Sequence, residues 1–143
     1  MLGSIKKILI SNYLLLLTLL NISCSINPNE NLSKELKTVS SWAATAHMVG
    51  EASIRGTVPT AYAKETLKKS LEKIQQETEK LSKSPEAQEE KVLEPLQQLQ
   101  QIITQMSIAV EQKDNKEIAT QLQRLSRQEK KIRTLEKQVS AKS

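Results

Sequence analysis

The sequence has very few aromatic residues and glycines. Its 143 residues include no Phe, one Trp, two Tyr and three Gly. All-β domains depend on aromatic and β-branched side chains and on glycine-rich turns, so this composition argues against a β-sandwich or a β-barrel. The abundant residues are Leu, Gln, Glu, Lys and Ala, which favour helices. The composition therefore predicts an all-α protein with an aliphatic core.

The chain also lacks the residues that metal sites and covalent catalysis need. It has one cysteine, Cys24, and one histidine, His47, so an internal disulfide is excluded. Neither the C-x-x-C-H sequence of covalent haem attachment nor the paired Glu-x-x-His sequences of di-iron bundles occur. No serine has the flanking glycines and the preceding strand of a nucleophile elbow. We expect no metal, no cofactor and no catalytic residue, and therefore no enzyme.

Positive charge is concentrated at the C-terminal end of the sequence. Residues 115–143 carry eight Lys and Arg against three Glu, which equals the net charge of +5 of the whole chain. We predict that this segment contacts anionic lipid headgroups or an acidic protein surface. The alternative is a solvated bundle face, because Glu129 and Glu136 are interleaved with the basic residues. Nucleic acid is not expected, since aromatic stacking residues are missing. The residues assigned to the anionic contact are Arg124, Arg127, Lys130, Lys131, Arg133 and Lys137.

One continuous apolar run occurs, near the start of the chain. It covers residues 8–20 with the sequence ILISNYLLLLTLL, directly after Lys6 and Lys7. This run is shorter than the roughly 20 residues that span a bilayer comfortably. Lysines followed by a short apolar segment are typical of a secretory signal peptide, which we predict over residues 1–23.

The junction LLNISC, which ends at Cys24, resembles the lipobox of bacterial prolipoproteins. Asn21 departs from the pattern of that family, which usually has Leu at this position. The resemblance implies that the Cys24 sulfur receives a diacylglycerol, that the leader is cut before Cys24, and that the new amine is acylated, for example with palmitate. The alternatives are an uncleaved helical anchor over residues 5–22 and an ordinary cleavage that releases the protein. Each places the remainder outside the cytoplasmic membrane, and we predict that it is anchored to a membrane in the cell envelope, facing the periplasm or the exterior.

For the rest of the chain, the sequence predicts a polar tether over residues 24–31 and then a series of helices. Their apolar positions repeat at near-heptad spacing, which is typical of shallow, coiled-coil-like packing. Pro95 lies inside the third helix, and we expect it to kink that helix rather than to start it. Short connections favour an up-down antiparallel four-helix bundle. The alternative is a three-helix coiled coil with a loosely docked first helix, and either could form a homo-oligomer. The predicted helices cover about 32–55, 59–82, 85–113 and 115–140.

The most unusual segment of the mature chain is SWAATAHMVGEASIRGTVPTAYA, residues 41–63. Its small residues allow close approach, either of a partner or ligand, or of another helix in a tight corner around the aromatic rings. The segment also resembles small exported proteins of cyanobacteria, which implies no activity. We predict a tethered structural or accessory protein-interaction module with a protein partner in the envelope, or alternatively a bundle that binds a small apolar ligand near Trp42. The residues predicted for this face are Trp42, His47, Glu51, Arg55 and Tyr62.

Overall fold

The computed structural model describes residues 27–143, which form five α-helices and no β-strand. The all-α prediction is confirmed for this part of the chain. The predicted signal peptide and Cys24 lie outside the described residues. The helices are α2 (Pro28–Ile54), α3 (Thr60–Ser82), α4 (Pro85–Glu89), α5 (Leu93–Gln112) and α6 (Asn115–Ser140).

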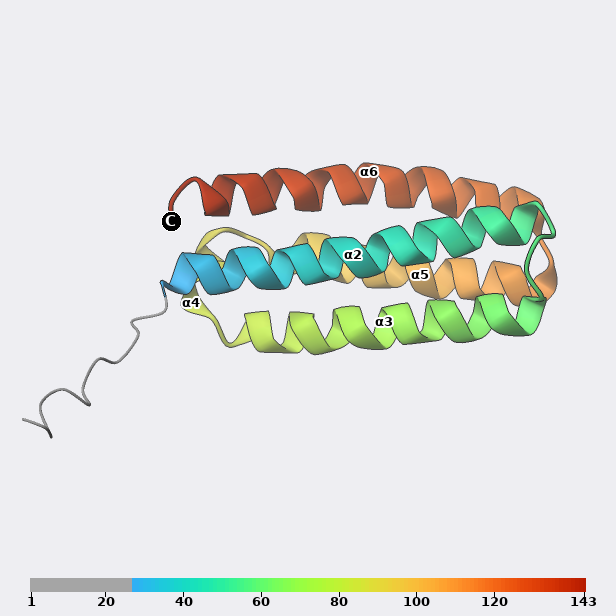
Figure 1. The fold of residues 1–143 in the computed structure, drawn as a ribbon, viewed down its shortest axis with the longest axis horizontal. Helices are drawn as coiled ribbons and strands as arrows, with labels where there is room; N and C mark the ends of the chain where they lie inside the picture. The colour runs from blue at the N-terminus through green and yellow to red at the C-terminus, as the bar shows by residue number, and fades with distance from the viewer. Residues whose placement is uncertain (1–26) are drawn as a thin grey trace, which may run out of the picture.

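The long helices lie side by side along the longest axis of the molecule (Figure 1). Helix α2 packs against both α3 and α6, and α5 packs against the same two helices. The short α4 contacts α2 and α3. The core between these helices is aliphatic, as predicted, and the third predicted stripe is completely buried. That stripe consists of Val92, Leu96, Leu99, Ile103, Met106 and Val110.

Helix α2 begins earlier than the sequence pattern indicates. The Asn27 side chain accepts a hydrogen bond from the backbone N–H of Asn29 at 3.1 Å, and Pro28 occupies the first helical position. A side-chain oxygen at the N-cap satisfies a backbone donor that the helix leaves free, and proline has no such donor to lose. Residues 28–31, which were assigned to the tether, are therefore helical.

The predicted third helix is divided in two, so the expected kink at Pro95 is wrong. Helix α4 ends at Glu89, Lys91 adopts a left-handed conformation with φ of 53°, and α5 begins at Leu93. Pro95 lies in the first turn of α5, where a missing N–H costs nothing. Ala87 and Val92 are both fully buried, so the apolar stripe continues across the break and conceals it.

At Gly50, helix α2 lies close to both α5 and α6. A Cβ atom on Gly50 would lie 2.7 Å from the Met106 sulfur of α5 and 3.0 Å from a methyl carbon of Leu122 in α6. Real Cβ atoms do not approach neighbours to 2.7 Å. Glycine therefore allows α2 to approach both other helices near its C-terminal end.

Candidate interaction surfaces

The residues predicted to share one face of α2 lie on two flanks of that helix. Trp42 is half-buried and packs on the core. Trp42 comes seven residues, or two helical turns, after Glu35, so the two side chains lie on the same face of α2. Glu35 interacts with the charges of Glu77 and Lys80 in α3. His47 comes five residues after Trp42, about 140° further round the helix. Trp42 therefore lies on the α3 side of α2, whereas His47 lies on another flank.

His47 makes a partly buried polar contact between α2 and α6. Its Nδ1–H donates a hydrogen bond of 2.8 Å to Oε2 of Glu129, whose side chain is only 10% exposed. Nε2 of His47 lies 3.6 Å from Glu51, and Arg133 lies 3.9 Å from the other oxygen of Glu129. In the sequence of α6, Glu129 lies between the apolar positions Leu125 and Ile132 that face the core. A single carboxylate at such a position indicates a polar partner on a neighbouring helix.

The other two predicted residues are exposed and apart from this contact. Arg55 follows the end of α2, and the Tyr62 side chain at the start of α3 is 58% exposed. Among the five predicted residues, the structure brings together His47 and Glu51. None of the surface hollows described below is lined by Trp42, so ligand binding there stays a prediction.

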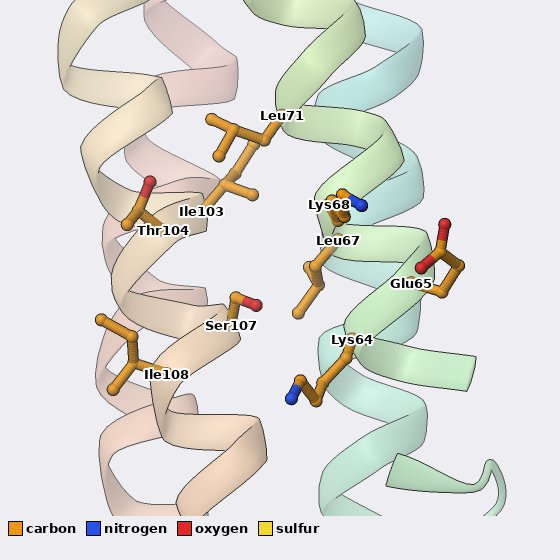
Figure 2. A pocket seen from close by; sticks show the side chains of 9 residues that line it. All are labelled: Lys64, Glu65, Leu67, Lys68, Leu71, Ile103, Thr104, Ser107 and Ile108. Carbon is orange, nitrogen blue, oxygen red and sulfur yellow. The ribbon is translucent and has the colours of Figure 1, made fainter. Parts of the chain in front are cut away.

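A shallow groove lies between α3 and α5, and the sequence analysis missed it (Figure 2). Its volume is about 270 Å³, and its floor is made by the apolar side chains of Leu67, Leu71 and Ile103. Ile108 stands at its edge with half of its surface exposed. The remaining lining residues, which complete what we call the α3–α5 groove, are Lys64, Glu65, Lys68, Thr104 and Ser107.

Two ion pairs border the α3–α5 groove. Lys64 of α3 bridges to Glu111 of α5 at one end, and Lys68 lies 4.0 Å from Glu72. The groove thus has an apolar floor and a rim of charged and hydroxyl-bearing side chains. Ile108 was the one available signal, because it is an isoleucine of α5 that falls outside the buried stripe.

The outer face of α6 carries basic residues without acidic ones. Glu129 is buried, while Glu117 and Glu136 are half-buried, so the acidic residues do not interleave with the basic ones on this face. Arg124 donates hydrogen bonds to the amide oxygens of Gln105 and Gln121, at 2.7 and 3.1 Å. A hollow of about 440 Å³ beside the strip is lined by Lys130 and Lys131. We call this face the basic strip; it comprises Lys116, Arg124, Arg127, Lys130, Lys131, Arg133 and Lys137, all of them exposed.

One half-buried carboxylate, that of Glu35, has an altered proton affinity. Burial raises the pKa of Glu35 above its ordinary value of 4.5, and repulsion from Glu77 adds to this, while Lys80 opposes it. On the surface, a hydrogen bond from Ser84 lowers the pKa of Glu86. Both groups lie in helix packing and capping positions away from the α3–α5 groove.

No family model, no curated protein and no solved structure matches this chain. Within residues 27–143, no helix is both long enough and apolar enough to cross a bilayer. In the same part of the chain, no group of three or more His, Cys, Asp or Glu side chains is placed to hold a metal ion.

Proposed function

We propose that this protein is a membrane-tethered lipoprotein of the cell envelope that acts as an accessory protein-interaction module, without catalysis. The observation that carries the interaction role is the α3–α5 groove, an apolar hollow on the outside of a helical protein. The lipobox-like sequence before Cys24 supports the tether. Two or three acyl chains would make such an anchor durable, since each buried CH₂ contributes about 0.8 kcal/mol.

The proposed occupant of the groove is one amphipathic helix of a partner protein. The α3 side of the groove runs from Lys64 to Leu71, a length of about 12 Å at 1.5 Å per residue. That length fits apolar side chains spaced one helical turn apart, as in other helix-in-groove contacts. Sites that enclose small molecules usually have volumes of about 300–1,000 Å³ and bury most of the ligand. A groove of about 270 Å³ that includes the exposed Ile108 is better suited to side chains of a partner.

The tether explains how so small a groove could be effective. Confining both partners to one membrane raises their local concentration, so a weak contact becomes frequently occupied. The mechanism is therefore positional: the lipid holds the helical domain near its partner, and the groove selects the partner.

We further propose that α2, α3, α5 and α6 form an up-down antiparallel four-helix bundle, with α4 as part of a connection. The pairing of neighbouring helices and the short turns between them support this arrangement. So do the colours of Figure 1, which run in opposite directions in successive long helices. The three-helix alternative would leave the first helix loosely docked, whereas Leu32, Leu36 and Val39 of α2 are fully buried.

Photocrosslinking in cells tests the interaction role. A photoreactive amino acid would replace Ile108 in the groove or, as the matched control, Met48, which is 64% exposed on α2. We expect a discrete adduct with one envelope protein from position 108 alone. A second substitution, Ser107→Arg, should abolish the adduct by filling the groove, while circular dichroism shows unchanged helicity. Equal adducts at both positions, or an adduct that survives Ser107→Arg, would contradict the proposal.

Fatty-acid labelling tests the tether separately. The wild-type protein should incorporate labelled fatty acid and partition into detergent, and Cys24→Ala should do neither. Membrane association of both proteins without label would instead indicate the uncleaved anchor.

A further inference from the structure

Four residues of the basic strip form a line of positive charge that runs from the first turn of α6 to its last. Lys116, Arg127, Lys130 and Lys137 follow one another on the outward side at spacings of 11, 3 and 7 residues, which are sums of three- and four-residue steps and keep side chains on one face. The line from Lys116 to Lys137 is about 32 Å long. This is several times the Debye length of about 8 Å at physiological salt, so the two ends of the line act as separate contacts.

Few acidic groups compensate this charge. Among residues 27–143, the ion pair recorded for the strip joins Arg133 to Glu129, at 3.9 Å. The positions between the basic residues along the line hold Thr120, Gln123 and Thr134, which are exposed and uncharged. The strip therefore presents a polar, positively charged ridge without apolar anchors.

The strip ends beside the point where the tether enters. Ser33 in the second turn of α2 and Ser140 at the end of α6 share a hydrogen bond of 2.6 Å between their hydroxyls. Cys24 precedes Asn27 by three residues, so the two residues can be at most about 10 Å apart. A lipid on Cys24 would consequently lie close to the end of α6 that carries Lys137.

We propose that the basic strip of α6 lies against the anionic headgroups of the membrane that holds the tether, an inference that rests on the proposed function for the lipid on Cys24. A plane of phosphates accepts any spacing of cations, whereas an acidic protein would need a surface shaped to one convex helix. Each Lys or Arg near an anionic bilayer strengthens binding by a factor of about five. The acyl chains already make the anchor durable, and the strip then sets which side of the domain faces the bilayer.

This placement also deepens the proposed role of the α3–α5 groove. Helix α6 packs against α2 and α5, and α3 packs against those same two helices from the other side. With α6 on the membrane, α3 lies on the side of the domain that faces away from the bilayer. The groove is then open to a partner while the domain is held down.

Vesicle flotation of the processed full-length protein, purified from its own membranes, tests the contact. The probes are vesicles of phosphatidylcholine alone and vesicles that also contain phosphatidylglycerol, each at low and high salt. The charge-removing variant carries Arg127→Gln, Lys130→Gln and Lys137→Gln. The matched control removes the same charge from α3 and its C-cap through Lys69→Gln, Lys73→Gln and Lys83→Gln.

We expect a preference for phosphatidylglycerol vesicles that falls by on the order of 100-fold in the α6 variant, disappears at high salt, and persists in the α3 control. Equal loss in both variants, or no preference in the wild-type protein, would overturn the proposal. Binding to poly-glutamate without a preference for phosphatidylglycerol would overturn it too, and would identify an acidic protein as the partner. Binding to neutral vesicles reports on the lipid of Cys24 alone, so failure of the tether is distinguishable.

Discussion

Replacing Gly50 by a residue larger than alanine should destabilise the protein through a specific clash with α5. Glycine to alanine in a helix interior normally gains about 1 kcal/mol. At Gly50 the new Cβ would lie 2.7 Å from the sulfur of Met106, which is fully buried. Because the thioether is flexible, we expect Gly50→Ala to be close to neutral. Gly50→Leu exceeds what Met106 can yield and should cost about 3 kcal/mol, the upper part of the range for overpacked cores.

The decisive measurement is a double-mutant cycle by urea unfolding, followed by far-UV circular dichroism. Met106→Ala alone should cost about 2–5 kcal/mol because it leaves a cavity. In the Gly50→Leu, Met106→Ala double variant the leucine fills that cavity, so the two losses should fall short of additivity by at least about 1 kcal/mol. Ala44→Leu on the exposed side of α2 is the control and should change stability by less than about 0.5 kcal/mol. Additive losses, or a Gly50→Leu variant as stable as the wild type, would refute the close approach of α2 to α5.

Three further predictions concern polar and backbone features. His47→Ala and Glu129→Ala should each cost about 1.5–3 kcal/mol in urea unfolding, and their double-mutant cycle should show coupling; additive losses would exclude the bond as a source of stability. The pKa of Glu35 is raised in the folded state, so the folded protein favours the protonated carboxyl. The contribution of Glu35 to stability is therefore fully present below pH 4.5 and is lost as the pH rises through the raised pKa. Glu35→Gln should therefore stabilise the protein at neutral pH but not below 4.5, and a gain independent of pH would contradict this. Lys91→Gly should stabilise by about 0.5–1 kcal/mol in thermal unfolding, because glycine adopts the left-handed conformation without strain; a loss would show that the backbone there is not left-handed.

Features set by neighbouring residues could be predicted from the sequence. The buried stripe of α5 follows from its spacing alone, because side chains three and four residues apart share a helix face. The cap of α6 was equally local: the Asp114 side chain accepts from the backbone N–H of Glu117 at 3.0 Å, as the capping-box spacing indicates. Both depend on one turn of helix and need no knowledge of the fold.

The break between α4 and α5 could not be predicted in the same way. Lysine is an uncommon residue at positive φ, and nothing in the sequence around Lys91 marks a turn as a glycine would. The apolar spacing also survives the break, since Val92 and Leu96 are both buried. A pattern that continues through a turn carries no information about that turn.

The pairing of His47 with Glu129 depends on the tertiary arrangement, because the two residues are 82 positions apart in the sequence. Periodicity placed each one on its own helix but could not show that the two helices are neighbours. The α3–α5 groove has the same origin. Its floor comes from the stripes of two helices, and only their packing leaves Ile108 beside a hollow.

The His47–Glu129 contact has a further consequence for how the domain would be held on a membrane. A partly buried polar contact between two helices need not add much stability, but it can fix the register of the helices. Here it joins α2, the helix that follows the tether, to α6, the helix that carries the basic strip. A slip of α6 by one turn along α2 would separate the two side chains by about 5.4 Å and break the bond. The pair thereby fixes how far the strip extends from the end where the lipid would be attached.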